Sequence, residues 1–224
     1  LQVQGADSVK RIVCGVTACE ALIHAAIEQS ADALLVHHGF FWKGDSPCVT
    51  GPLRQRLALL LRHSINLLAY HLPLDVHPIV GNNVGLAAAL NIIVTGEFDT
   101  GVAGLGLMGE LSEPCSSAEF SNRIEKNLNR KPLLISAGAH PIHKIAWCTG
   151  AAQDYIMQAA LHGVGAFISG EVSERTYHLA QELGVHYFAA GHHATERFGV
   201  QSLGEHLKEQ FNIESMYIDI NNPV

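Results

Sequence analysis

The chain has 224 residues, of which 48% are hydrophobic and 16% charged, and it carries a net charge of −7 at pH 7. This composition excludes a disordered chain and suits one large domain or two smaller ones. The acidic balance excludes a general nucleic-acid or membrane-surface binder, because no surplus of Lys and Arg exists to neutralise phosphates. No apolar run is long enough to span a membrane. Histidine is unusually frequent, since its 14 copies equal Lys and Arg together.

Short apolar runs alternate with amphipathic stretches along the chain. In the first part we expect elements at 11–16 (strand), 18–30 (helix), 31–38 (strand), 51–64 (helix) and 66–74 (strand). A Gly-rich section at 96–110 lacks the spacing of phosphate-binding loops and is assigned to a hairpin or a connection. In the second part we expect elements at 116–128 (helix), 131–138 and 144–150 (strands), 151–163 (helix), 166–171 (strand), 173–184 (helix), 186–191 (strand), a long helix from about 194, and 214–220 (strand). This alternation predicts an α/β fold with parallel-type sheets flanked by helices.

The chain contains an internal repeat. Residues 11–39 align without a gap with residues 144–172, so that strand, turn, helix and second strand coincide. At the third strand of each half, His71 then lies over His192 and Asp75 lies over Glu196. We therefore predict a duplicated α/β unit, organised either as two similar halves or as one continuous domain. The predicted ranges are 1–95 for the first unit, 96–140 for the connecting segment and 141–224 for the second unit.

Histidines and carboxylates gather where the predicted strands end. Ligands of open parallel sheets bind at the carboxyl ends of the strands, so we expect these side chains to meet and to form a metal site between the halves. The strand-end residues are His37, His38, His71, Asp75, His192 and Glu196.

Imidazole nitrogens and carboxylate oxygens are ligands that zinc, iron, manganese and nickel accept. One structural zinc ion takes four ligands, whereas five suit two metal ions that keep open positions for water. The predicted metal ligands are His37, His38, Asp75, His192 and Glu196. Adjacent residues of a regular strand point to opposite faces, so His37 and His38 converge only if the chain turns, which Gly39 would permit.

Further residues have two interpretations each. Glu171 aligns with His38 in the repeat and either lines the same pocket or is a carboxylate at a helix start. Phe40, Phe41 and Trp42 either wall a pocket for a planar ring or serve packing alone. The five cysteines form no CxxC pair and indicate reduced thiols of a cytoplasmic protein, with no thiolate in the metal site.

Five segments carry a resemblance to a known family: LLVHHGFFWKG, HLPLDVHP, GNN, FISGEVSE and FAAGHHATER. Together they resemble the Nif-three-like family, whose bacterial members are described as type 2 GTP cyclohydrolase I homologues. The resemblance covers nearly the whole chain and is nearest to the short enterobacterial form. Members of the family usually have a further helix before the segment where this sequence begins. The resemblance implies a dinuclear metal centre in a toroidal homohexamer, and it leaves His71 as a pocket residue rather than a principal ligand. The ligands it implies are His37, His38, Asp75, His192 and Glu196.

The leading hypothesis is a cytoplasmic hydrolase with two divalent metal ions per chain that acts on a nucleotide or related small molecule. Hydroxide made from a metal-bound water would attack C8 of guanine in a cyclohydrolase, or phosphorus in a phosphoesterase. His71 or Glu171 would shuttle protons. The alternative is a metal-binding scaffold or metal chaperone without turnover. A third hypothesis, a regulatory protein that binds a partner, predicts a sizeable exposed apolar patch.

Overall fold

The computed structural model describes residues 1–224 as a mixed α/β chain with two compact units. The first unit comprises Leu1–Leu74 and Gly199–Asn221, and the second comprises Asp75–Phe198 and Asn222–Val224. These units differ from the predicted contiguous ranges, because the chain returns to the first unit near its end. No helix has the length and apolarity that a bilayer crossing requires.

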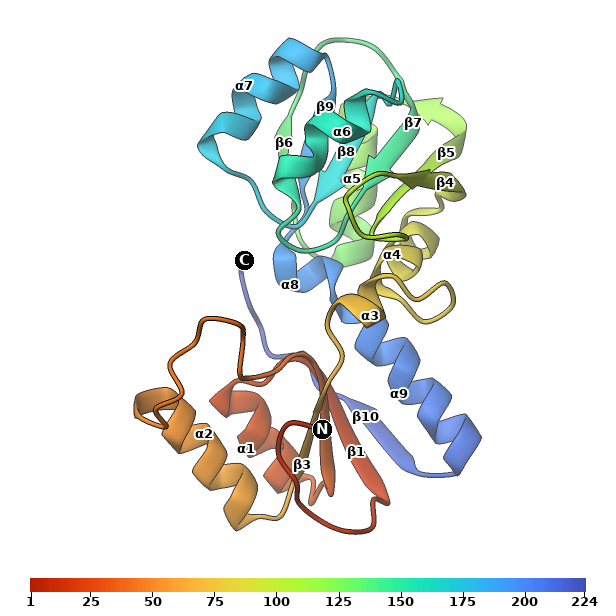
Figure 1. The fold of residues 1–224 in the computed structure, drawn as a ribbon. Helices are drawn as coiled ribbons and strands as arrows, with labels where there is room; N and C mark the ends of the chain where they lie inside the picture. The colour runs from red at the N-terminus through yellow and green to blue at the C-terminus, as the bar shows by residue number, and fades with distance from the viewer. The chain divides into compact units, whose positions relative to one another are not determined.

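The first unit is built on a four-stranded parallel sheet in the order β10-β1-β2-β3. Its strands are β1 (Arg11–Thr17), β2 (Ala33–His38), β3 (Asn66–Ala69) and β10 (Glu214–Tyr217). Helices α1 (Glu20–Glu28) and α2 (Gly51–Arg62) lie on one side of this sheet, and α9 (Arg197–Phe211) lies on the other (Figure 1). The core of the first unit lies between the sheet and helices α1 and α2, and it consists of apolar side chains of these helices and of alternate strand positions.

Residues 199–221 belong to the first unit because α9 and β10 pack on β1. Strand β10 runs parallel to β1, and Arg11 Nε lies 2.6 Å from Glu214 Oε2. A Cβ atom at Gly204 of α9 would lie 2.7 Å from Ser215 Oγ and 2.8 Å from Cys14 Sγ. The predicted closing strand therefore exists, but it extends the first sheet rather than the second.

The second unit has a six-stranded mixed sheet in the order β4-β5-β7-β8-β9-β6. Its central strands β7, β8 and β9 are parallel, whereas β4, β5 and β6 pair with their neighbours antiparallel. The parallel pattern predicted from the alternation thus holds for the centre of this sheet, and the Gly-rich section 96–110 lies in the β4–β5 hairpin. The strands are β4 (Ile93–Phe98), β5 (Gly106–Cys115), β6 (Leu133–Ile135), β7 (Ile142–Trp147), β8 (Ala166–Ser169) and β9 (His186–Ala189).

Helices cover both faces of the second sheet (Figure 1). On one face, α4 (Asn82–Leu90) and α5 (Ser117–Leu128) enclose a core that includes Trp147. On the other, α6 (Ile156–Ala160) and α7 (Glu174–Leu183) pack over Phe167 and Tyr187. The predicted helix 151–163 is realised as a 3-10 turn at Gln153–Tyr155 followed by the short α6, and α4 is a helix that the sequence pattern does not predict.

The strand pairings confirm the first part of the internal repeat. Ile12 pairs with Ala33 between β1 and β2, and the aligned residues Ile145 and Ala166 pair between β7 and β8. Both units therefore contain the same strand–helix–strand arrangement in the same register, as the alignment of residues 11–39 with 144–172 predicts.

The third strand of the repeat is shifted by one residue from the sequence alignment. The aligned residues Val36 and Ser169 pair with Ala69 and Ala189, which makes Ala69 and Ala189 equivalent. The helical turns α3 (Leu72–Asp75) and α8 (His192–Thr195) begin three residues after Ala69 and Ala189, respectively. Their first residues, Leu72 and His192, are therefore equivalent. The overlays of His71 on His192 and of Asp75 on Glu196 are therefore both wrong by one residue, because the hydrogen-bonding register of the strands decides which residues are equivalent.

Candidate metal centre

The first unit brings three histidines together at the carboxyl ends of its strands. The ring centroids of His37 and His38 lie 4.7 Å apart, and the ring of His71 lies 4.9 Å from His37 and 5.4 Å from His38. One ligand nitrogen of each ring lies within 4.8 Å of the other two. Three imidazoles at this spacing form a donor set for a divalent metal ion.

Adjacent His37 and His38 converge because strand pairing stops around them. The pairing of β2 with β3 stops at Val36, and the pairing of β2 with β1 stops at His38. A Cβ atom at the next residue, Gly39, would lie 2.1 Å from Gln2 Oε1. Gly39 is thus required for close packing, and the left-handed residue of this turn is Phe41, with φ of 63°.

The second unit places a histidine and two carboxylates in one cluster. His192 begins the turn α8, and its Nε2 lies 3.0 Å from Oε2 of Glu196, which follows the same turn. Its Nδ1 lies 2.6 Å from Glu171 Oε1. Glu171 therefore belongs to this cluster and is not a helix-start carboxylate, since α7 begins at Glu174 with Ser173 as its N-cap.

The two carboxylates change the protonation of His192. Burial lowers the pKa of the imidazole, because it disfavours the charged form. The hydrogen bonds and charges of Glu196 and Glu171 outweigh burial and raise the pKa to about 9. The raised pKa favours the imidazolium form of His192 in the metal-free protein at neutral pH, so that a single positive charge faces both carboxylates.

Asp75 is held by a buried polar network in the second unit. Its Oδ1 accepts hydrogen bonds from Asn82 Nδ2 at 2.8 Å and Thr149 Oγ1 at 3.4 Å. Asn83 Nδ2 donates to the Asp75 backbone oxygen at 3.3 Å, and Asn83 Oδ1 accepts from the Thr149 backbone N–H at 3.1 Å. The sequence interpretation gives no role to Asn82 or Asn83, although both lie in the GNN segment that contributes to the family resemblance.

Two glycines allow the backbone to approach His192 and Glu196 closely. Gly150 has a left-handed backbone with φ of 69°, and a Cβ atom there would lie 2.1 Å from Glu196 Oε1. A Cβ atom at Gly170 would lie 2.6 Å from the Cα of His192. Larger residues at these strand ends would displace the proposed ligands.

The three histidines predicted as ligands share one feature: an oxygen atom lies within hydrogen-bonding distance of each Nδ1. Metal-binding histidines are usually held in this way, because the contact fixes the ring orientation and directs the lone pair of Nε2 to the metal. The pairs are His37 with the Tyr70 backbone oxygen at 2.8 Å, His38 with Thr17 Oγ1 at 3.1 Å, and His192 with Glu171 Oε1 at 2.6 Å.

The cysteines are not part of these donor sets. All five are free thiols. Burial, followed by the negative charges of Asp75 and Glu196, raises the pKa of Cys148, so this thiol stays neutral near physiological pH. The donor chemistry is therefore imidazole and carboxylate, which suits several first-row divalent ions.

Comparison with known proteins gives matches over the whole chain. A family model described as Duf34/NIF3 (NGG1p interacting factor 3) matches residues 1–223. A protein of Pseudomonas aeruginosa named GTP cyclohydrolase 1 type 2 homolog is 54% identical over 224 residues, which cover 100% of this chain and 88% of the relative. The protein of the same name from Escherichia coli is 50% identical, with 100% and 89% covered.

Solved structures match the fold closely. Protein ybgI, described as of unknown function, matches with a TM-score of 0.96 and 50% identity, covering 100% of this chain and 90% of that one. The protein TTHA1606 from Thermus thermophilus matches with a TM-score of 0.87 and 30% identity, covering 100% and 89%.

Proposed function

Because this chain belongs to the Duf34/NIF3 family, we propose that it is a metal-dependent hydrolase that acts on a nucleotide or a related small molecule. The observation that carries the metal assignment is the oxygen partner at Nδ1 of His37, His38 and His192. The name of the relatives, GTP cyclohydrolase 1 type 2 homolog, supports a nucleotide as the substrate class and makes GTP the first compound to test.

The proposed centre holds two divalent metal ions per chain, which are zinc, iron, manganese or nickel. Its donor set of imidazoles and carboxylates fits such ions, and five protein ligands leave positions for water and substrate. When bound, these ions lower the pKa of a coordinated water toward neutrality and thereby supply hydroxide. The proposed ligands are His37, His38, Asp75, His192 and Glu196.

The surrounding residues orient the ligands and manage protons. Glu171 Oε1 accepts a hydrogen bond from Nδ1–H of His192, which leaves Nε2 as the coordinating atom. Asn82 Nδ2 holds Oδ1 of Asp75 and so fixes the orientation of that carboxylate. We assign proton transfer to an imidazole nitrogen of His71 rather than to Glu171, because Glu171 already holds His192.

We also propose that six chains assemble as a toroidal homohexamer in the cytoplasm. The family resemblance supports the assembly, and the five free thiols suit a reducing compartment. Native mass spectrometry tests the assembly directly, since the proposal requires a particle of six times the monomer mass.

The test of function is turnover by the metal-loaded protein on a panel of nucleotides that includes GTP, with products identified by mass spectrometry. His192→Ala serves as the blank. Formate and a ring-opened product from GTP, absent with the variant, would support a cyclohydrolase, and phosphate release would support a phosphohydrolase. Absence of turnover with two metal ions bound per chain would contradict the hydrolase proposal and favour a metal scaffold or chaperone.

A further inference from the structure

A tryptophan stands beside the histidine cluster of the first unit. The Trp42 ring lies edge-on to the ring of His71, with centroids 4.7 Å apart and an interplanar angle of 76°. Its centroid lies 6.2 Å from that of His38. Trp42 nevertheless remains 43% exposed, which leaves part of the residue open to a further planar group.

The start of the loop that carries Trp42 is fixed by a side chain from the N-terminal segment. The Phe40 backbone N–H donates to Gln2 Oε1 at 2.6 Å, and Gln2 Nε2 donates to the Phe40 backbone oxygen at 2.7 Å. The Phe40 side chain is buried in the core, with the Arg56 guanidinium 6.0 Å from its ring centroid. The residue two positions before Trp42 is therefore anchored through both its backbone and its side chain.

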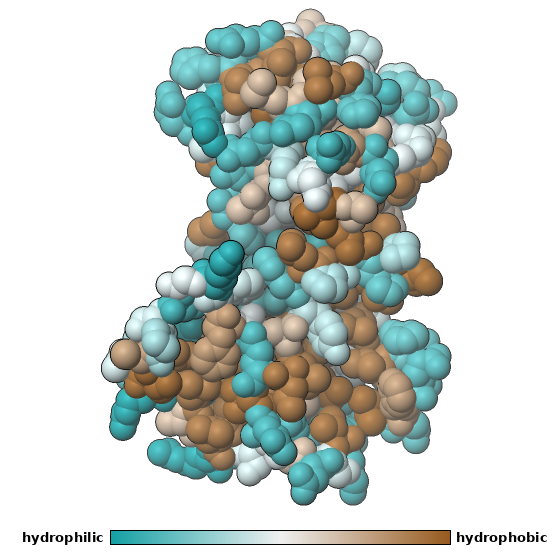
Figure 2. Space-filling model, in the orientation of Figure 1, coloured by the Kyte–Doolittle hydropathy of each residue, from teal (hydrophilic) through white to brown (hydrophobic).

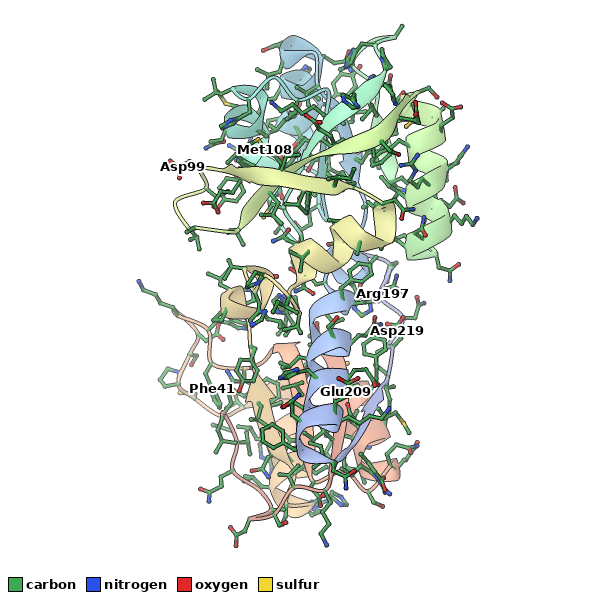
Figure 3. The ribbon with its side chains drawn as sticks, turned by 90° about the vertical axis from the view of Figure 1, so that its right-hand side faces the viewer. Phe41, Asp99, Met108, Arg197, Glu209 and Asp219 are labelled. Carbon is green, nitrogen blue, oxygen red and sulfur yellow. The ribbon has the colours of Figure 1, made fainter.

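The chain turns at Phe41, and this turn places Trp42 at the surface. Phe41 adopts a left-handed backbone with φ of 63°, which is unfavourable for a bulky residue. Figure 3 shows Phe41 at the surface of the first unit, where 54% of it is exposed. The Trp42 backbone N–H donates to Asp45 Oδ2 at 3.1 Å, and the Asp45 backbone N–H donates to the Trp42 backbone oxygen at 3.0 Å. Strained backbone of this kind concentrates at functional sites.

Exposure alone does not distinguish Trp42. Figure 2 shows apolar residues on the visible face of both units, and scattered exposed apolar side chains are normal for folded proteins. Trp42 differs because its loop is fixed on both sides of a strained residue and because its ring contacts a residue of the histidine cluster.

We propose that the Trp42 indole is a stacking platform for a planar heteroaromatic ring of the substrate, namely a nucleobase. This inference rests on the proposed function and narrows its substrate class to compounds that contain a base. Bases stack on aromatic side chains with little selectivity, because every base has a π-face. Purine and pyrimidine nucleotides should both bind, and sugar phosphates without a base should bind much more weakly.

Intrinsic fluorescence of the zinc-loaded full chain tests the proposal without any need for turnover. The chain has two tryptophans, and Trp147 is fully buried with its Nε1 donating to the Asn83 backbone oxygen. The difference between the unsubstituted protein and Trp42→Phe therefore isolates the signal of Trp42. We expect saturable quenching by GTP, ATP, CTP and UTP, none by ribose 5-phosphate, and none in Trp42→Phe.

Equilibrium binding of radiolabelled nucleotide supplies the energetic test. Trp42→Ala should raise Kd about tenfold, which is about 1.4 kcal/mol, whereas Trp42→Phe keeps a stacking ring and should raise it less. Phe211→Ala is the matched control, because it removes an exposed aromatic ring of the first unit at the end of α9, outside the loop that carries Trp42, and should leave Kd within a factor of about two.

Several results would overturn the platform. These are unchanged nucleotide affinity in Trp42→Ala, equal quenching by ribose 5-phosphate, no saturable quenching by any nucleotide, or a change in native mass as the only effect of the substitution. Turnover that is independent of Trp42 would defeat the platform and leave the hydrolase proposal intact. Trp42-dependent binding without turnover would do the reverse.

Discussion

Glu171 Oε1 lies 2.6 Å from His192 Nδ1, so a carboxylate holds the ring nitrogen opposite the proposed coordinating atom. This hydrogen bond joins Glu171, in the loop after β8, to His192, the first residue of α8. It gives the glutamate after β8 a role in orienting His192. Such contacts fix the ring and raise the basicity of the ligand, and their loss typically costs about 10- to 100-fold in metal affinity.

Glu171→Gln should therefore weaken zinc binding by about 10- to 100-fold while the fold is retained, because the amide keeps the size but not the charge of the carboxylate. Competition with a chromophoric chelator measures the affinity. Glu174→Gln is the matched control, since this neighbouring glutamate is exposed and pairs only with His178 within α7. Equal effects of the two substitutions would show that net charge, and not the contact with His192, sets the affinity.

Metal affinity should rise with pH up to about 9. The pKa of His192 is raised to about 9 in the metal-free protein, so at lower pH a metal ion must displace the proton. Displacement of one proton gives about a tenfold gain in affinity per pH unit below the pKa. Proton release on zinc addition in weakly buffered solution checks the same point, and an affinity that is constant between about pH 7 and 9 would be inconsistent with it.

Asn83→Ala should lower the free energy of unfolding by about 3 kcal/mol or more, because it leaves several buried polar groups without their hydrogen bonds. These groups are the backbone oxygens of Asp75 and Leu105 and the backbone N–H of Thr149. Urea unfolding measures the change. Asn127→Ala is the control, since that exposed amide bonds only within its own helix, and it should change stability by less than about 0.5 kcal/mol.

Gly170→Ala should destabilise the second unit by about 1–3 kcal/mol and reduce bound metal, because the added methyl group would meet the backbone of His192 and Gly150. Gly96→Ala is the matched control: its Cβ would meet only Met108 Cε, at 4.0 Å. Thermal unfolding measures the stability of both variants, and elemental analysis measures their metal content. A Gly170→Ala protein with unchanged stability and metal content would mean that the strand end can shift at no cost.

The strand-end histidines could be predicted from the sequence, because apolar runs mark the strands and each run ends in a polar residue. The register of the third strand could not. His71 and His192 are the same residue type and align in the sequence. The pairing of Ala69 with Val36 and of Ala189 with Ser169 shows that the two histidines are not structurally equivalent. Hydrogen-bonding partners decide register, and a sequence alignment does not contain them.

The network around Asp75 and the return of the C-terminal segment were also beyond the sequence. Asn82 and Asn83 are residue types common in turns, and only their burial shows that they bind Asp75 and Thr149. Helix α9 and strand β10 follow the second half in the chain, so their place in the first unit depends on long-range packing such as that at Gly204.

The central claim is that His37, His38, Asp75, His192 and Glu196 bind metal, and elemental analysis of purified protein tests it most directly. The measurement compares the metal content of the unsubstituted chain with that of His192→Ala and Asp75→Ala, with circular dichroism to verify folding. We predict two divalent ions per chain in the unsubstituted protein and a clear loss in each folded variant. Full metal content in both variants would contradict the ligand assignment.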